Sequence, residues 1–125
     1  MLIVKIILVI VIICLVYLAF RFFFPVIQVC GDSMFPTYRD GEVLLSRRVF
    51  SRKKVQKGDV IVYCMHENGE RNVIKRVADI KMVENNLSFY CLGDNPKESY
   101  DSRYYGYIPS ALLVCKPFNQ RRCLK

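Results

Sequence analysis

The chain has 125 residues, enough for one small domain and no more. Hydrophobic residues make up 53% of it, and much of this excess lies in the first 27 residues. The formal net charge of +8 favours contact with an anionic membrane surface. No recognition motif accompanies that charge, so we expect no nucleic-acid partner. The densest basic stretch, at positions 47–57, also fits a plain solvated loop.

The N-terminus predicts a membrane anchor at residues 1–25. Residues 6–20 carry no charge, and Lys5 and Arg21 stand near the ends, where long basic side chains reach the headgroups. Residues 22–24 are phenylalanines suited to the interface, and Pro25 ends the helix. A cleaved signal peptide is the alternative, but no pair of small residues follows at the required spacing. The flanking charges lean toward an N-terminus on the inner side.

Residues 26–125 predict a small, mainly β, antiparallel domain without a long amphipathic helix. Short β-rich segments alternate with turns, and a polar loop is expected at 93–103. The expected strands are residues 26–30, 42–46, 59–66, 71–80, 87–92 and 111–116.

Lys75 stands out because it lies in an apolar hairpin. A two-residue turn at Asn68-Gly69 would place Lys75 opposite Val62, with Arg76 on the other face. The five apolar neighbours on the Lys75 face would be Val60, Val62, Cys64, Val73 and Val77. Burial there would lower the pKa of the amine and make it a usable general base. Alternatively, Lys75 reaches solvent at the sheet edge, or the register slips by one residue and Arg76 faces inward.

The six cysteines do not predict a metal centre. Cys14 lies in the apolar span, which leaves five others, and the chain has no C-x-x-C motif and one histidine. We expect most of them to be small buried hydrophobic residues, with no metal and no cofactor.

Three ordered segments carry a family resemblance. GDSMFPT at 31–37 follows the anchor, KRV stands at 75–77, and GDNPKESYDSRYYG covers 93–106. In this order the segments resemble the nucleophile, lysine and C-terminal boxes of the type I signal peptidases. Any one of them alone would be a weak signal, but together they cover most of the chain.

The resemblance implies a serine endopeptidase. Ser33 would be the nucleophile and Lys75 its general base, a serine–lysine variant of the catalytic triad. Ser99 would position the lysine. Asp101 and Arg103 would form a structural ion pair beneath the site.

The sequence departs from the family pattern in several places. Many relatives have a hydroxyl two residues before the nucleophile, where this chain has Gly31, so the Ser33 N–H would be the remaining oxyanion donor. The family's Gly-Pro-Gly-Asp turn after the lysine box is replaced at 78–82. Asp94 and Asn95 would hold a turn in the last box. The short stretch between the last two boxes implies a minimal catalytic core.

The resemblance also implies the partners. The substrate would be a pre-protein with small residues one and three positions before the cut, bound as an extended strand. Membrane lipid would be the second partner. The expected location is the cell membrane, single-pass, with the catalytic domain on the extracytoplasmic face. Two alternatives stay open: a self-cleaving repressor-type Ser–Lys peptidase, and a membrane-tethered binding module without catalysis.

Overall fold

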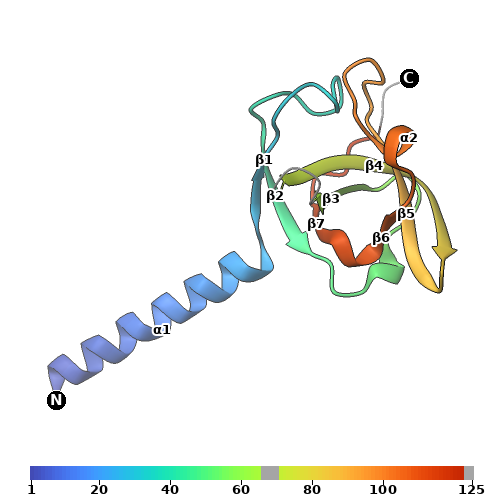
Figure 1. The fold of residues 1–125 in the computed structure, drawn as a ribbon. Helices are drawn as coiled ribbons and strands as arrows, with labels where there is room; N and C mark the ends of the chain where they lie inside the picture. The colour runs from blue at the N-terminus through green and yellow to red at the C-terminus, as the bar shows by residue number, and fades with distance from the viewer. Residues whose placement is uncertain (66–70, 123–125) are drawn as a thin grey trace.

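The computed structural model describes residues 1–65 and 71–122 and shows one N-terminal helix joined to a curved β domain (Figure 1). Seven strands form one sheet in the order β1-β2-β7-β3-β4-β5-β6, and every neighbouring pair is antiparallel. The predicted fold class, mainly β with an apolar N-terminal helix, is therefore confirmed. The strands are β1 (Val26–Gln28), β2 (Val43–Arg48), β3 (Val60–Met65), β4 (Arg71–Val83), β5 (Asn86–Leu92), β6 (Ile108–Pro109) and β7 (Leu113–Pro117).

Helix α1 (Leu2–Phe23) points away from the domain (Figure 1). Its 22 residues give a length of roughly 33 Å at 1.5 Å per residue, close to the thickness of a bilayer's hydrocarbon core. None of its residues is buried in the protein, and the mean hydropathy of its most apolar 18 residues is 3.2. The helix ends two residues before Pro25, in keeping with the restriction that proline places on the residue before it. An exposed apolar helix of this length is suited to crossing a membrane.

The middle strand β3 is buried on both faces. Val60 and Val62 pack in one apolar cluster with Met34 and Tyr38. The alternate residues Ile61 and Tyr63 pack in a second cluster with Val77, Phe89 and Cys91. Because successive strand residues point to opposite faces, the curved sheet has an apolar layer on each side of β3.

The hairpin of β3 and β4 differs from its predicted register by one residue. Lys75 pairs with Ile61, and Ile74 pairs with Val62. Lys75 therefore shares a face with Ile61, Tyr63 and Met65, not with the predicted Val60, Val62 and Cys64. The predicted Asn68-Gly69 turn lies outside the described residues. Arg76 still faces the other way, as predicted.

Several short elements were not predicted. The expected polar loop ends in the short helix α2 (Ser102–Tyr105), which Asp101 caps through the Arg103 N–H. The strand β6 and the two 3-10 turns η1 (Arg52–Lys54) and η2 (Ser110–Leu112) are also additional. Residues 78–82, where relatives have a turn, continue β4 after an irregularity in its pairing between Val77 and Asp79.

Candidate active site

The loop that carries Ser33 lies between β1 and β2 and is fixed at several points. Gly31 adopts a φ of +82°, a conformation that favours glycine, and its N–H donates to Oδ1 of Asp40 at 2.7 Å. Met34 and Tyr38 are 1% and 0% exposed and anchor the loop in the core. Ser33 itself is half-buried. The buried side chains on its C-terminal side hold the hydroxyl in a defined place.

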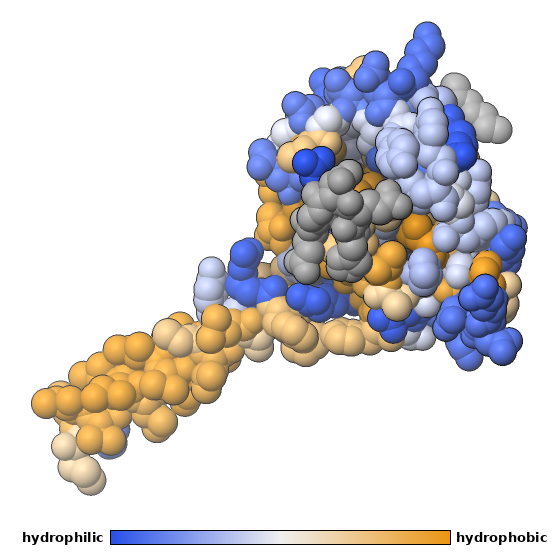
Figure 2. Space-filling model, viewed as in Figure 1, coloured by the Kyte–Doolittle hydropathy of each residue, from blue (hydrophilic) through white to orange (hydrophobic). Residues whose placement is uncertain are grey.

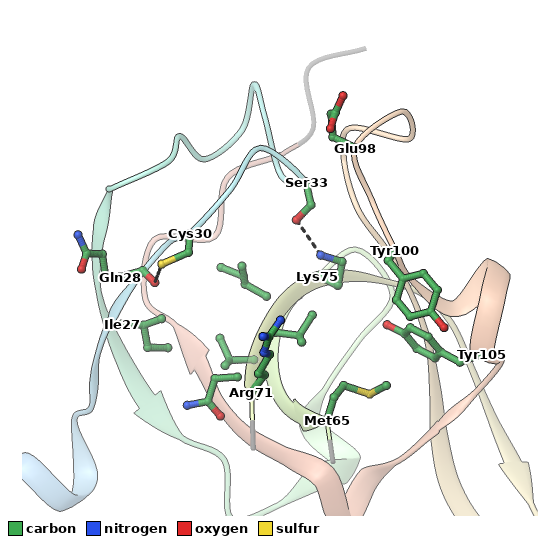
Figure 3. Close-up of a pocket in the computed structure, with 14 residues that line it drawn as sticks. Ile27, Gln28, Cys30, Ser33, Met65, Arg71, Lys75, Glu98, Tyr100 and Tyr105 are labelled. Atoms are coloured by element: carbon green, nitrogen blue, oxygen red, sulfur yellow. Dashed lines mark hydrogen bonds between the residues drawn. The ribbon is translucent and has the colours of Figure 1, made fainter. Parts of the chain in front are cut away.

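Lys75 and Ser33 meet although 42 residues separate them. Nζ of Lys75 donates a hydrogen bond to Oγ of Ser33 at 2.7 Å (Figure 3). Only 4% of Lys75 is exposed, and this burial lowers its pKa below the ordinary lysine value of 10.5. The negative charges of Asp101 and Asp94 oppose that shift, Asp101 the more strongly. A lysine in this state can lose its proton more readily than an exposed one and accept a proton from a neighbouring hydroxyl.

Asp101 is the centre of a buried hydrogen-bond cluster. Its carboxylate, which is 0% exposed, accepts from Ser99 Oγ at 2.6 Å and from the Gly93 N–H at 2.9 Å. Arg103 donates to both oxygens, at 2.9 and 2.7 Å. Burial acts to raise the Asp101 pKa, but these hydrogen bonds outweigh it and the pKa is lowered. The ion pair expected between Asp101 and Arg103 is thus present in the geometry.

Ser99 lies in this cluster and not on the lysine. Its hydroxyl donates to Asp101, and among the described residues no hydrogen bond joins Ser99 to Lys75. The positioning of the lysine amine by Ser99 therefore stays a prediction. What the structure shows is that Ser99 links to the carboxylate whose charge acts on Lys75.

Asp94 and Asn95 do more than form a turn. The Asn95 N–H donates to the Ser33 carbonyl at 2.9 Å, and its side-chain Nδ2 donates to the Asp32 carbonyl at 3.0 Å. Asp94 accepts two hydrogen bonds from Arg76, at 2.8 and 2.7 Å. The C-terminal box thus holds both the Ser33 loop and strand β4. Sequence reasoning missed these links, although the Asp-Asn pair in a polar loop was a visible signal.

Gly93 fits a space that no side chain could share. A Cβ atom added there would lie 2.1 Å from Ser99 Oγ and 2.6 Å from the Ser33 carbonyl oxygen. The residue is buried and directly follows β5. Its lack of a side chain lets the last box approach the Ser33 loop closely.

Ser33 and Lys75 open into a cleft with a volume of about 520 Å³ (Figure 3). Strand β1 is at the edge of the sheet, and residues 71–75 of β4 pair with β3 on one side only, since β5 pairs from Arg76 onward. Two partly unpaired strand edges therefore border the cleft. The lining residues are Ile27, Gln28, Cys30, Ser33, Val62, Met65, Arg71, Asn72, Val73, Ile74, Lys75, Glu98, Tyr100 and Tyr105.

Tyr105 forms part of the cleft wall and is braced from behind. Its hydroxyl shares a hydrogen bond with that of the buried Tyr63, and its ring centroid lies 5.4 Å from that of Tyr100. Burial raises the pKa of Tyr105 to about 12, so the phenol stays neutral at physiological pH. The wall is therefore uncharged at this point.

The described cysteines are free thiols, and no cluster of three or more metal-ligating side chains occurs within residues 1–65 and 71–122. The expectation that most cysteines are buried is wrong for the described residues: Cys91 and Cys115 are buried, but Cys64 is half-buried and Cys14 and Cys30 are exposed. Burial raises the pKa of Cys91 to about 12, so its thiol is neutral beside Lys75. Cys123 lies outside the described residues.

Comparison with known proteins identifies the family. The family described as "Signal peptidase, peptidase S26" matches residues 2–81, which include Ser33 and Lys75. Mitochondrial inner membrane protease subunit 1 of Xenopus tropicalis is 32% identical over 120 residues, covering 80% of this chain and 70% of that protein. The mouse (Mus musculus) protein of the same name is 28% identical over the same shares. Signal peptidase I W of Bacillus subtilis (strain 168) is 34% identical over 68 residues, covering 54% of this chain and 35% of that protein.

These relatives, together with α1 as the one helix in the described part of the chain that is long and apolar enough to cross a membrane, indicate a single-pass membrane protein with peptidase function. The family match covers well over half of the chain. The chain belongs to the signal peptidase family, peptidase S26.

Proposed function

We propose that this protein is a membrane-bound serine endopeptidase that removes signal peptides from pre-proteins, with Ser33 as nucleophile and Lys75 as general base. The observation that carries the proposal is the 2.7 Å contact between Nζ of Lys75 and Oγ of Ser33, with the lysine only 4% exposed. A buried amine with a lowered pKa next to a hydroxyl is the arrangement that serine–lysine catalysis requires.

The proposed reaction has two stages. In the first, neutral Lys75 takes the Ser33 proton as Oγ attacks the scissile carbonyl, and then gives that proton to the leaving amine. This leaves an acyl group on Ser33. In the second stage, Lys75 takes a proton from a water molecule that attacks the acyl carbon, and the proton returns to Ser33 Oγ as the ester breaks.

The Ser33 N–H is the proposed oxyanion donor. Among the described residues no hydrogen bond uses this N–H, so it is available for a carbonyl oxygen. Gly31, two residues earlier, has no side chain to supply a second donor. One donor of this kind contributes about 3 kcal/mol to transition-state stabilisation in other serine proteases.

The cleft supports an extended substrate. A peptide between β1 and residues 71–75 of β4 could form main-chain hydrogen bonds with either strand edge, as in other cases of strand addition. Near Ser33 the wall holds Ile74, Tyr100 and Tyr105, which leave apolar surface for the side chains before the cut. Small residues one and three positions before the cut are the proposed preference.

The proposed location is the cell membrane, with the β domain on the extracytoplasmic face. The names of several relatives refer to the mitochondrial inner membrane, and one is a bacterial signal peptidase. Fractionation of a cell that produces the full-length chain, with protease protection of the β domain, would distinguish the two membranes and give the orientation.

The proposed function is tested with purified full-length protein in detergent micelles and a secretory precursor that has alanine one and three positions before the expected cut. We expect one new N-terminus directly after the second alanine, read by mass spectrometry of the product. Leucine or lysine at either position should reduce kcat/KM by at least about 100-fold. Cleavage that ignores both positions would refute the substrate assignment, and cleavage by the Ser33→Ala variant would refute the nucleophile.

A further inference from the structure

A second cavity, of about 220 Å³, lies outside the active-site cleft and shares no lining residue with it. It is enclosed by the end of β2, the segment that follows, and one residue of β7. Four of its eight lining residues are basic. The lining residues are Arg47, Arg48, Val49, Phe50, Ser51, Lys54, Val55 and Lys116.

Positive charge in this cavity is poorly compensated. Lys116 pairs with Asp59, but no ion pair within the described part of the chain involves Arg47, Arg48 or Lys54. No carboxylate lines the cavity. Arg48 uses its Nε–H on the Phe22 carbonyl at 2.7 Å, which leaves the other guanidinium N–H groups for a ligand. Three basic residues without an ion-pair partner among the described residues thus line a space large enough for a phosphate group.

The cavity lies at the membrane end of the domain. The ring of Phe50 is 5.8 Å from that of Phe23, at the end of the anchor helix, and Arg48 lies 4.6 Å above the Phe22 ring. Phe118 stacks on Phe24 at 5.9 Å. Figure 2 shows apolar side chains continuing from the helix along the lower rim of the domain, with hydrophilic side chains beside them. When the helix spans a bilayer, this rim lies at headgroup level.

The exposed aromatic residues support the same position. Phe50 is 67% exposed and Phe118 is 49% exposed, although each packs against a phenylalanine at the helix end. Phenyl rings of this kind suit the zone where headgroups meet acyl chains. The apolar rim suits the acyl chains of a phospholipid, and the three basic residues beside it suit the phosphate of its headgroup.

We propose that this cavity binds the phosphate of one anionic phospholipid, with Arg47, Arg48 and Lys54 on the headgroup and Phe50 against its acyl chain. One guanidinium group can donate two parallel hydrogen bonds to two phosphate oxygens, which favours this donor set over a lone ammonium. Strand β2 carries both arginines and pairs with β1, which leads to the Ser33 loop. A bound lipid therefore fixes the tilt of the active-site cleft above the bilayer. This inference depends on the membrane anchor and not on the proposed peptidase activity.

Native mass spectrometry of the full-length protein, released from detergent micelles with added lipid, tests the proposal. We expect one phosphatidylglycerol to bind at least about tenfold more tightly than phosphatidylcholine with the same acyl chains. Replacing Arg47, Arg48 and Lys54 together by glutamine should abolish that preference. The matched control replaces the exposed residues Arg39, Lys81 and Arg122 by glutamine, which removes the same charge and should keep it.

Three results would overturn the assignment: no preference in the wild type, an equal loss in both triple variants, or displacement of the lipid by an equal concentration of soluble glycerol 3-phosphate. The last would show a general anion site rather than a lipid site. Because Lys54 is exposed, Lys54→Gln alone tests the cavity without a risk to folding, and a loss of preference of about threefold is expected.

Discussion

Asn95 ties the C-terminal box to the Ser33 loop: its backbone N–H donates to the Ser33 carbonyl at 2.9 Å, and its Nδ2 donates to the Asp32 carbonyl at 3.0 Å. Both hydrogen bonds join residues that are distant in sequence: Asn95 lies 63 positions after Asp32. They fix the peptide unit that contains the Ser33 N–H, through the Asp32 carbonyl, and the peptide unit that follows Ser33. The orientation of the proposed oxyanion donor therefore depends on Asn95, for which no hydrogen bond to Lys75 is found among the described residues.

Asn95→Ala removes the side-chain hydrogen bond and leaves the backbone bond in place. We expect kcat to fall by about tenfold with little change in KM, because the loop keeps its fold but holds the N–H less firmly. The melting temperature should change by no more than a few degrees. Asn86→Ala is the matched control, since its Nδ2 also donates to a backbone carbonyl, that of Glu84, but away from the site. A loss of kcat as large in this control would contradict the explanation.

Gly93→Ala tests how closely the last box must approach the Ser33 loop. The added methyl group would meet Ser99 Oγ at 2.1 Å and the Ser33 carbonyl at 2.6 Å, so the loop must move. We expect activity to fall by about 100-fold and the free energy of unfolding to fall by about 2 kcal/mol. Steady-state kinetics and thermal unfolding in micelles measure both. Activity within twofold of wild type would show that the Ser33 position is less constrained than described.

The activity should rise with pH as Lys75 loses its proton. Burial lowers the Lys75 pKa, so the rising limb of kcat/KM should have an apparent pKa below 10.5. The Asp101 carboxylate acts in the opposite direction by favouring the charged amine. Asp101→Asn should therefore move the rising limb to lower pH, even if the maximal rate falls.

Asp79→Asn is the control for this pH profile. Its carboxylate pairs with Lys57 and accepts from the Tyr107 hydroxyl, and it is not among the charges that act on Lys75. The rising limb should stay in place in this variant. A limb that shifts to higher pH in Asp101→Asn would show that the titrating group is not Lys75.

The buried amine of Lys75 should lower the free energy of unfolding at neutral pH. Its pKa in the folded state lies below the unfolded value of 10.5, so the folded state binds fewer protons and stability rises with pH between those two values. Lys75→Met keeps an unbranched side chain, one heavy atom shorter, without the buried amine. We expect this variant to be inactive yet more stable by about 1 kcal/mol at pH 7.

The difference between Lys75→Met and wild type should shrink as the pH approaches 10.5. Chemical unfolding in micelles at several pH values measures it. Lys97→Met, at an exposed position, is the control and should change stability little at any pH. A Lys75→Met variant less stable than wild type at pH 7 would mean that the amine gains more from Ser33 than it loses by burial.

The sequence was sufficient for the helix, the antiparallel β class and the burial of Lys75, but not for the hairpin register. The reason lies in β3, where the four residues Val60, Ile61, Val62 and Tyr63 are all buried. When both faces of a strand are apolar, alternation does not show which face a partner residue shares. The register then depends on the turn, and a one-residue difference changed the three predicted neighbours of Lys75 on β3, whereas Val73 and Val77 on its own strand stay on its face.

The links made by Asn95 and by the Arg76–Asp94 pair were beyond sequence reasoning for another reason. Asn95 lies 63 positions after Asp32, and a hydrogen bond between such segments has no periodicity to reveal it. Arg76 and Asp94 are 18 positions apart, and the pairing of Arg76 with Leu92 that brings them together was not predicted. The family resemblance predicted that the three boxes belong together. It did not predict that Ser99 would bond to Asp101 and not to the lysine.

The most direct test of the Ser33–Lys75 mechanism is the conversion of a secretory precursor with a small-x-small site by the full-length protein, in membranes depleted of other signal peptidases. We expect conversion by wild type and a loss of at least about 1,000-fold in both Ser33→Ala and Lys75→Met, with folding checked by thermal unfolding. Lys75→Arg should be equally inactive, because a guanidinium group keeps its proton. Conversion that persists in Ser33→Ala, or in both Lys75 variants, would contradict the mechanism.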